Sequence, residues 1–462
     1  MKQKKEREKE ISQWPWISML PFGILAGYWG DKEVRITAIS EYGFQTRLAT
    51  PATAEQKNAP WELAFYDQKT ASYQRILLRD ATFLQEKEED FDVVYTFATE
   101  QEDYQNAVQH LALQYSQYIR WKMEDDDAAL AEHMTGYPAE QDAFHLESLE
   151  EQKKVWFSGI TKETFVALQN SAAGSGQPIE LALELDRPEW YKAYLSMESA
   201  VFFDAYFRRN QIPDPPLFHP DRLYIGNAFC PHLAPTEEEL FALMDKACRE
   251  SFSITLTFPF LLEENLSETQ QRLQRLAEWC ERKNKTVELV VNDWGMASLV
   301  KKSRRNLIPS LGILLNKRRK DPRIPFKKGE QKWFERNSLN AGFYRDFLER
   351  EYGIQRFEWE SCGYEQQIPP GKNSLHIPFY QTNTSQYCPL GAVCETGERG
   401  RQKLAKKCPG YCTEYALLYP EHLHMIGRYN SLFGIDMRIL KEEEILKNYI
   451  QNGVDRVVIR AW

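Results

Sequence analysis

The chain has 462 residues and a mass of 54.2 kDa, more than one hydrophobic core normally supports, so we expect two or more domains. Hydrophobic residues make up 42% of the sequence, which is enough to build packed cores and excludes a wholly disordered chain. The formal net charge of -9 argues against general binding to nucleic acids or membrane surfaces, although it leaves room for a local basic patch.

The N-terminal stretch, MKQKKEREKE followed by WPWISMLPF, is charged and then broken by prolines. It lacks the apolar segment and cleavage site of a secretory signal peptide, and no apolar run elsewhere reaches membrane-spanning length. We therefore expect a cytoplasmic protein without membrane contact. In that reducing compartment the eight cysteines are better candidates for metal ligands or buried thiols than for structural disulfides.

Residues 1–122 predict a small antiparallel β-barrel closed by a helix. A helix is expected at the end of this region, because Tyr104, Val108 and Leu111 begin an apolar stripe with helical spacing that continues through Tyr118. The expected strands, separated by turn-rich spacers, are 33–38, 43–48, 61–66, 73–78 and 93–97.

The segment RITAISEYGFQTRL, at 35–48, resembles a signature of the PilZ family with the pattern Asp/Asn-x-Ser-x-x-Gly. Ser40 and Gly43 match it, but Ala38 stands at the acidic or amide position and no Arg-x-x-x-Arg motif precedes it. In PilZ domains those arginines hold cyclic di-GMP through bidentate contacts that are hard to replace. The resemblance implies a PilZ-like fold without cyclic di-GMP binding; an unrelated small barrel is the alternative.

An acidic connector is expected between two domains. Residues 124–151 contain ten acidic residues and no Lys or Arg, a composition typical of a solvated segment. The small-residue stretch SAAGSGQP at 171–178 marks a second junction. We place the connector at 123–178.

Residues 179–462 alternate β-like and helical segments, which predicts an α/β architecture, most simply a partial or complete parallel (β/α) barrel. Two of the helices carry capping-box patterns, Thr236 with Glu239 and Ser267 with Gln270. The expected strands are 179–185, 223–228, 254–258, 287–291, 310–315, 357–360 and 374–380.

Half of the cysteines cluster near the C-terminus: Cys388, Cys394, Cys408 and Cys412 lie within 25 residues. Structural zinc sites usually combine two close cysteine pairs, whereas here only Cys408 and Cys412 form one. An iron–sulfur cluster accepts thiolates from scattered loops because they bind separate irons. The spacing therefore favours an iron–sulfur cluster over zinc, and buried or merely reduced thiols are a further alternative.

Roughly residues 215–462 resemble the peptidase family U32, most closely its iron–sulfur accessory proteins of ubiquinone hydroxylation. The resemblance implies that Cys230, Cys388, Cys408 and Cys412 bind a [4Fe-4S] cluster. The loop from Cys388 to Cys408 is longer than in those relatives, which leaves Cys394 open as a replacement for Cys388 or Cys230, although it is the least favoured of the five. The matching segments are DRLYIGNAFC (221–230), HIPFYQTNTSQYC, CPGYCTEY, NDWG (292–295) and the final GVDRVVIRAW.

This resemblance implies an iron–sulfur protein of anaerobic metabolism that acts in oxygen-independent, hydroxylation-type modification or as an accessory subunit for it. Whether the chain is itself an enzyme stays open, because no residue marks itself as a general base. A U32-type peptidase is a second hypothesis, but the sequence has neither an HExxH nor a G-x-S-x-G motif. The third is a non-catalytic redox-sensing or regulatory protein with a degenerate PilZ-like domain.

Residues 301–336 hold thirteen basic and three acidic residues, a local charge of +10. A solvated loop at a barrel rim is the simpler interpretation, and contact with RNA is the functional one, since U32 relatives act in RNA modification. A partner protein subunit is also implied by the accessory role.

The remaining candidates are minor: Cys248 and Cys280 on helices, Cys362 after a strand, and His376, His422 and His424 on strands.

Overall fold

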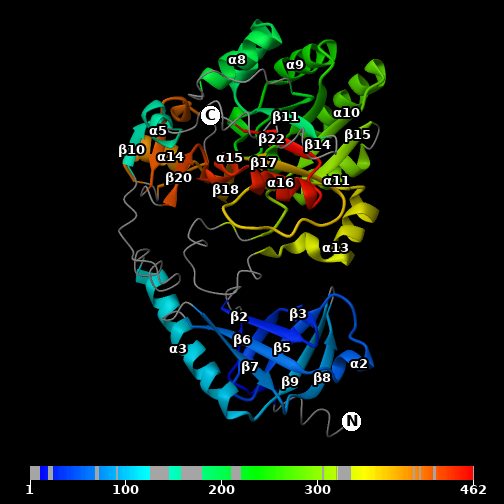
Figure 1. Ribbon diagram of the computed structural model, residues 1–462, viewed down its shortest axis with the longest axis vertical. Helices are drawn as coiled ribbons and strands as arrows, with labels where there is room; N and C mark the ends of the chain where they lie inside the picture. The colour runs from blue at the N-terminus through cyan, green and yellow to red at the C-terminus, as the bar shows by residue number, and fades with distance from the viewer. Residues whose placement is uncertain are drawn as a thin grey trace. The chain divides into compact units, whose positions relative to one another are not determined.

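The computed structural model describes residues 11–18, 24–67, 72–89, 92–124, 145–157, 179–209, 220–303, 306–318, 320, 335–398, 401–404, 407–419 and 423–460. The chain divides into two compact units: an N-terminal unit up to residue 142 and a C-terminal unit that contains nearly all of the rest (Figure 1). Most of the predicted connector at 123–178 lies outside the described residues. None of the helices described combines the length and apolar character needed to cross a membrane.

The strands of the N-terminal unit form two antiparallel sheets, in the orders β1-β4-β5-β9-β8 and β3-β2-β6-β7. The predicted strand 33–38 is interrupted at Arg35, so its two halves belong to different sheets. The elements are β1 (Ile17–Ser18), β2 (Leu25–Trp29), β3 (Lys32–Val34), β4 (Ile36–Ser40), β5 (Gly43–Leu48), α2 (Ala54–Lys57), β6 (Trp61–Asp67), β7 (Ser72–Leu78), β8 (Thr82–Glu88), β9 (Val93–Ala98) and α3 (Glu102–Glu124).

Aromatic rings fill the core between these two sheets. The rings of Trp29 and Trp61 stack with their centroids 4.9 Å apart, and Phe97 meets Trp61 edge-on at 4.9 Å. Helix α3 is anchored to this core by Tyr104, which is fully buried and whose hydroxyl donates to the carbonyl oxygens of Ser40 and Gly43. The predicted helix is therefore present, and its apolar stripe packs on the sheets.

The predicted parallel barrel of the C-terminal unit is confirmed and is complete: its strands close into a ring because β22 pairs with both β11 and β17. Alternation of strands with helices explains the closure, since each helix carries the chain back across the outside of the barrel. The strands are β11 (Glu180–Leu185), β12 (Arg222–Gly226), β13 (Ser253–Thr257), β14 (Val287–Val291), β15 (Leu307–Leu311), β16 (Arg356–Glu360), β17 (Lys372–Ile377) and β22 (Arg456–Ile459).

Helices cover the outside of this barrel (Figure 1). The first capping box is confirmed, because Thr236 and Glu239 cap α9 reciprocally. The second is wrong: a 3-10 turn, Glu263–Asn265, runs directly into α10, so Ser267 lies inside the first helical turn. The helices are α7 (Pro188–Ser196), α8 (Ser199–Arg209), α9 (Glu237–Arg249), α10 (Leu266–Lys283), α11 (Trp294–Lys302), α13 (Gly342–Phe347), α15 (Arg438–Lys441) and α16 (Glu443–Gln451).

A second, antiparallel sheet follows the carboxyl end of β17, in the order β10-β19-β20-β21-β18. The predicted strand 374–380 is in fact two strands, because the chain turns at the cis Ile377–Pro378 peptide and leaves the barrel. The elements are β10 (His145–Ser148), α5 (Leu149–Trp156), β18 (Phe379–Thr384), α14 (Pro389–Thr396), β19 (Tyr415–Leu418), β20 (Met425–Arg428) and β21 (Ser431–Ile435).

Candidate metal centre

Two of the predicted ligands sit in tightly held loops of the C-terminal unit. Cys230 follows the carboxyl end of β12, and the side-chain oxygen of Asn227 accepts hydrogen bonds from the backbone N–H groups of Phe229 and Cys230, both at 2.8 Å. Cys388 caps α14, where its sulfur accepts a hydrogen bond from the N–H of Gly391 at 3.2 Å. Local hydrogen bonds therefore hold the backbone of Cys230 and the thiol of Cys388.

The other two predicted ligands flank a glycine turn before β19. Cys408 is exposed, and its sulfur accepts a hydrogen bond from the N–H of Gly410 at 3.4 Å. Gly410 has φ of 82°, a backbone conformation that glycine adopts without steric cost. The turn leads into Cys412, which is buried in the short 3-10 segment Tyr411–Thr413.

The four thiols are close enough to interact electrostatically. Burial raises the pKa of Cys230, and repulsion from Cys412, Cys388 and Cys408 raises it further. Burial likewise raises the pKa of Cys388 to about 11, with the same repulsion from Cys412 and Cys408. The loop after β12 and the 388–412 segment are far apart in the sequence, so only the barrel fold explains why their thiols interact.

The remaining cysteines lie in other surroundings. Cys394 is half-buried on α14, and its pKa is raised by burial and by Glu395 rather than by any of the four thiols. Cys362 is buried after β16, where Arg318 and Tyr364 are its neighbours. Cys248 and Cys280 lie on helices α9 and α10, as predicted for ordinary buried or half-buried thiols.

A single metal ion and an iron–sulfur cluster place different demands on thiol ligands. In the part of the chain that the structure describes, no three His, Cys, Asp or Glu side chains are grouped closely enough to hold a single metal ion. Four thiolates around one Zn²⁺ each lie about 2.3 Å from it, which demands a tight group. Thiolates of an iron–sulfur cluster bind separate irons and can stand farther apart. All eight cysteines are free thiols.

Two buried basic side chains, Arg187 and Arg428, act on Cys412, and a third, Lys153, lies near these two. They come from separate elements: Arg187 precedes α7, Arg428 ends β20 and Lys153 lies in α5. Burial raises the pKa of Cys412, and the charges of Arg428 and Arg187 oppose that effect. Burial and repulsion from Arg187 lower the pKa of Arg428 to about 10. Burial and repulsion from Arg428 and Arg187 lower the pKa of Lys153 to about 7.

The barrel lumen, into which alternate residues of each strand point, is filled by ion pairs instead of the usual branched apolar side chains. Arg456 reaches across from β22 to Glu288 on β14 at 2.6 Å and also contacts Glu180 at 2.6 Å. Burial opposes the ionised form of Glu288, but Arg456 outweighs it and lowers the carboxyl pKa to about 2. The Tyr224 hydroxyl lies 2.9 Å from Arg456 and 3.1 Å from Glu358.

A second group of charges occupies the carboxyl end of the lumen. His376 places Nε2 3.0 Å from Glu358 and Nδ1 3.7 Å from Glu184, and Arg460 bridges Glu184 at 2.6 Å and Glu360 at 3.2 Å. Burial would lower the pKa of His376, but hydrogen bonds to the two carboxylates raise it above its usual value. Burial opposes ionisation of Glu360, yet nearby cations, Arg460 among them, lower its pKa to about 2.

This charged group adjoins the Cys230 loop. The Arg460 guanidinium lies over the ring of Phe229, 5.3 Å from its centroid, and Asn430 donates to the Phe229 carbonyl oxygen at 2.6 Å. Phe229 is the residue before Cys230, so the loop that carries one thiol packs directly on the lumen charges. Sequence reasoning did not find these charges. The alternation of charged and apolar residues in ELALEL, RFEWE and RVVIR was the signal that could have revealed them.

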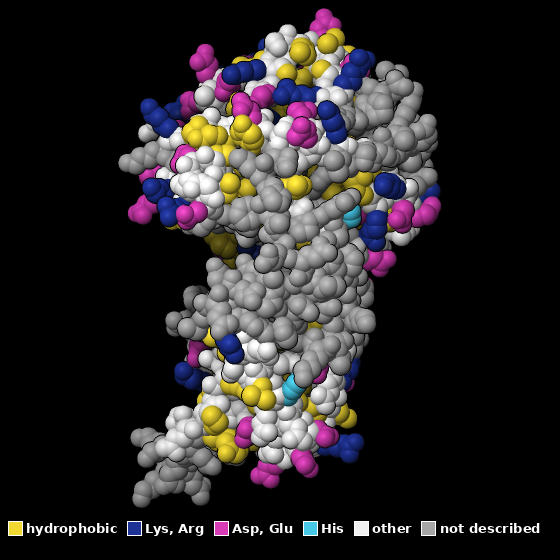
Figure 2. Space-filling view, turned by 90° about the vertical axis from the view of Figure 1, so that its left-hand side faces the viewer, with side chains coloured by type: hydrophobic (Ala, Val, Ile, Leu, Met, Phe, Trp, Pro, Cys, Tyr) yellow, Lys and Arg dark blue, Asp and Glu magenta, His cyan; other side chains and the backbone are white. Residues whose placement is uncertain are grey.

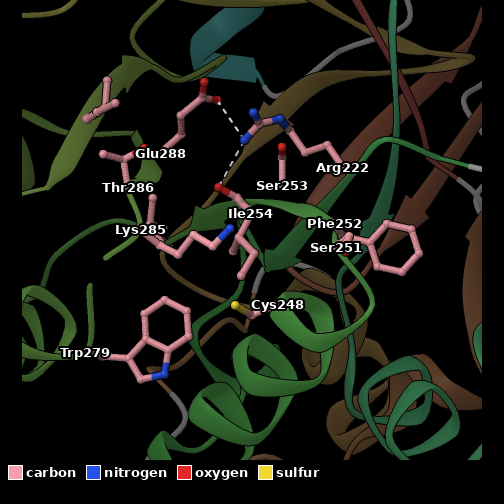
Figure 3. A pocket seen from close by; sticks show the side chains of 12 residues that line it. Arg222, Cys248, Ser251, Phe252, Ser253, Ile254, Trp279, Lys285, Thr286 and Glu288 are labelled. Carbon is pink, nitrogen blue, oxygen red and sulfur yellow. Dashed lines mark hydrogen bonds and ion pairs between the residues drawn. The ribbon is translucent and has the colours of Figure 1, made fainter. Parts of the chain in front are cut away.

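A separate cavity of roughly 220 Å³ lies at the amino end of the barrel. On one side of the cavity, Arg222 forms an ion pair with Glu288 at 3.6 Å and donates a hydrogen bond to the Ile254 carbonyl oxygen at 3.0 Å (Figure 3). Trp279 lines another side of the cavity. In barrels of this type the amino end usually contributes stability, while chemistry occurs at the carboxyl end. This cavity is therefore distinct from the thiol site.

The other sequence-based candidates have mixed outcomes. His376 lies on a strand as predicted, but His424 precedes β20 and has φ of 47°, so the strand prediction is wrong for it; His422 lies outside the described residues. Much of the basic stretch 301–336 is also outside them. On the face of the C-terminal unit in Figure 2, acidic and basic side chains are intermingled.

Comparison with known proteins adds little to this description. No family model and no curated protein matches the chain. The solved structure of an uncharacterised Legionella protein matches 23% of this chain and 96% of that chain, at 15% sequence identity and a TM-score of 0.16. A likeness at that score carries no information about fold or function. The fold and the site themselves define the class: a closed parallel barrel with a candidate cysteine-ligated centre.

Proposed function

We propose that the chain is an iron–sulfur protein of the peptidase U32 type. Its [4Fe-4S] cluster would be held by Cys230, Cys388, Cys408 and Cys412. The protein would act in oxygen-independent, hydroxylation-type modification or as an accessory subunit for it. The observation that carries this proposal is the electrostatic interaction of Cys230 with Cys388, Cys408 and Cys412. The pKa of Cys394 is instead shifted by burial and by Glu395.

The charges beside the thiols support the choice of cluster. The buried charges of Arg187 and Arg428 beside Cys412 would offset the negative charge of four thiolates, because opposite charges attract strongly where water is excluded. The donor set and its surroundings therefore fit an anionic cluster.

The chain's own residues would have separate tasks around that group. A bound cluster would supply electrons one at a time. Asn227 holds the loop that carries Cys230 by a hydrogen bond. The Phe229 ring of this loop packs against the Arg460 guanidinium of the lumen. His376, held between Glu184 and Glu358, keeps a proton at the carboxyl end of the barrel, where barrel enzymes bind their substrates. An organic substrate would be placed there.

Location and partners complete the proposal. The eight free thiols suit a reducing compartment, which supports a cytoplasmic location. An accessory role would require a partner subunit. RNA contact through residues 301–336 rests on the local charge of +10 alone.

Anaerobic reconstitution with ferrous iron and sulfide tests the ligand set. The wild-type protein and the Cys394→Ala control are expected to bind iron and sulfide in equal amounts and to show the brown absorbance of a cluster. Cys230→Ala, Cys408→Ser and Cys412→Ser are expected to lose it. Full iron occupancy in Cys408→Ser, or loss of the cluster in Cys394→Ala alone, would contradict the assignment. Stoichiometric zinc in protein purified without oxygen would favour the zinc alternative.

A further inference from the structure

One buried side-chain amide links the two loops that carry Cys230 and Cys388. Asn430 belongs to the tight turn between β20 and β21 and is 4% exposed. Its side-chain Nδ2 donates hydrogen bonds to the carbonyl oxygen of Phe229 at 2.6 Å and to that of Ser385 at 2.7 Å. Because both carbonyl oxygens bind the same nitrogen atom, the two loops meet at this point, although they are far apart in the sequence.

In the first of these loops, the peptide bond that joins Phe229 to Cys230 is held at both of its polar groups. Its carbonyl oxygen accepts the hydrogen bond from Asn430 at 2.6 Å, and its N–H donates to the side-chain oxygen of Asn227 at 2.8 Å. Asn227 belongs to the same loop, whereas Asn430 comes from the second sheet. Since the peptide unit is planar, contacts on both of its edges fix the orientation of the backbone at Cys230.

The second loop is held by a reciprocal pair of hydrogen bonds. Asn430 Nδ2 donates to the Ser385 carbonyl oxygen, and the Ser385 N–H donates to the Asn430 carbonyl oxygen at 3.0 Å. The Ser385 hydroxyl in turn accepts a hydrogen bond at 3.1 Å from the N–H of Tyr387, the residue before Cys388. The turn that leads to Cys388 is therefore attached to the same side chain as the Cys230 loop.

The turn that carries Asn430 is itself constrained. Tyr429 has φ of 42°, a left-handed conformation that residues other than glycine adopt at a cost, and such strain persists where the surroundings fix it. Its ring stacks on Phe229 at 6.3 Å between centroids and meets Phe433 edge-on at 5.5 Å. The Ser431 hydroxyl donates to Asn430 Oδ1 at 3.2 Å, which turns the amide nitrogen towards the two carbonyl oxygens.

We propose that Asn430 is a positioning residue of the thiol centre: it holds the Cys230 loop against the Cys388 loop, so that thiols from both loops can bind one cluster. The inference rests on the proposed function, because it requires a cluster on the four cysteines. Asn430 is not itself a ligand, since protein groups bind both ends of its amide. Groups behind the ligands help a site to retain its metal because they fix the ligands in place.

The test is the rate at which a chelator removes iron from full-length protein reconstituted anaerobically with ferrous iron and sulfide. Asn430→Leu keeps a similar size but has no donor, and it is expected to release iron about tenfold faster than the wild type. Asn430→Gln keeps an amide donor and is expected to restore part of the retention. If Asn430→Leu does not fold, Asn430→Ser replaces it, with a smaller increase, because a hydroxyl can donate to only one of the two oxygens.

Asn373→Leu is the matched control. Asn373 is also a fully buried amide, and its Nδ2 donates to the carbonyl oxygens of Gly371 at 3.2 Å and Gly453 at 3.1 Å. It lies near the start of β17, whereas Cys230 follows the carboxyl end of β12, at the other end of the parallel barrel. Asn373→Leu is expected to lower the melting temperature of the iron-free protein at least as much as Asn430→Leu, without faster release of iron.

Hydrogen exchange of the iron-free protein gives a second readout, which does not depend on a cluster. In Asn430→Leu, the peptides that contain residues 229–230 and 385–388 are expected to exchange faster than in the wild type. In Asn373→Leu the same peptides are expected to keep their protection. Unchanged exchange of both peptides in Asn430→Leu would overturn the inference, because the two loops would then be held without Asn430.

The outcomes separate the two proposals. Wild-type protein that binds no iron and sulfide would end the proposed function, and this inference with it. A cluster that the wild type and Asn430→Leu retain equally well would end this inference alone. Equally fast release of iron from Asn373→Leu and Asn430→Leu would also overturn it, because retention would then follow overall stability and not the contact between the two loops.

Discussion

The core of the N-terminal unit and the barrel lumen of the C-terminal unit are built from opposite materials. In the N-terminal unit, rings such as Trp29, Trp61 and Phe97 pack face to face and edge to face, and no charged side chain is buried among its described residues. In the C-terminal unit the barrel lumen holds buried carboxylates and guanidinium groups, among them Glu360 and Arg460. The first interior is an ordinary core, while the second concentrates charge where water is scarce.

This difference indicates where the chemistry of the molecule lies. An aromatic core stabilises a fold by burying apolar surface, and its rings do not by themselves indicate a reaction. Buried ion pairs often stabilise a fold no better than apolar residues of the same size would. We therefore interpret the lumen charges as functional, and they adjoin the Cys230 loop through Phe229 and Arg460. Four measurements test this difference between the aromatic core and the charged lumen.

The largest effect is expected when a lumen pair is broken. Arg460→Met leaves the buried carboxylates Glu184 and Glu360 without one of their cations, which destabilises the C-terminal unit by about 3–5 kcal/mol. Urea unfolding followed by hydrogen exchange of barrel peptides measures the loss. N-terminal peptides are the internal control and are expected to keep their protection. A loss below about 1 kcal/mol would mean that the lumen is solvated and not a buried ionic core.

Acid is expected to act unequally on the two interiors. The pKa of Glu288 and of Glu360 is lowered to about 2, so the stability they contribute is complete above the ordinary glutamate pKa and is lost as pH falls from there towards 2. The loss is roughly 3 kcal/mol for each carboxyl group. Brief pepsin digestion at pH 3 is expected to cleave the C-terminal unit first. Earlier cleavage within the aromatic core would reverse the comparison.

A smaller effect is expected from the aromatic core. Phe44→Leu keeps an apolar side chain but leaves a void against Trp61 and Phe97, and it destabilises the N-terminal unit by about 1.5 kcal/mol. Iron and sulfide binding should remain at the wild-type level in reconstituted protein. Loss of the cluster in this variant would show that the two interiors are not functionally separate.

The smallest effect is expected at a surface cap that touches neither interior. Thr236→Ala removes the hydroxyl that accepts a hydrogen bond from the Glu239 N–H at the start of α9, which lowers the stability of the C-terminal unit by about 1 kcal/mol. Thermal unfolding measures it, and Glu239→Gln, which can keep the reciprocal hydrogen bond, serves as the milder control. An effect as large as that of Arg460→Met would show that the lumen pairs are not exceptional.

Sequence periodicity predicted seven of the barrel strands, most of them with boundaries within a residue or two, whereas β22 entered only through the family resemblance of the final segment. It placed the strand Ser310–Leu315 too late and merged β17 with β18, since an apolar run does not reveal where the chain changes sheets. Strand β8 was missed because TFLQEKE is largely polar and mostly exposed. Polar edge strands carry little apolar signal.

The thiol site was predicted from cysteine spacing together with a family resemblance and stays a prediction, and the electrostatic interaction of Cys230 with Cys388, Cys408 and Cys412 is consistent with it. The surrounding cations could not be predicted. Arg187, Arg428 and Lys153 come from three segments whose proximity depends on the β10–β19 and β19–β20 pairings. Charged residues in isolation normally indicate a solvated surface. Only the completed packing shows that these three are buried.

The closure of the barrel by β22 has a consequence for how the protein is made. Strand β11 must wait for residues Arg456–Ile459, because its pairing partner on that side is synthesised last. A nascent chain therefore exposes Cys230 to the cell long before Cys388, Cys408 and Cys412 leave the ribosome. The lumen charges also remain in water until that moment. The proposed thiol centre would then assemble after β22 has been made, and truncation before Arg456 would leave an open sheet for quality control to remove.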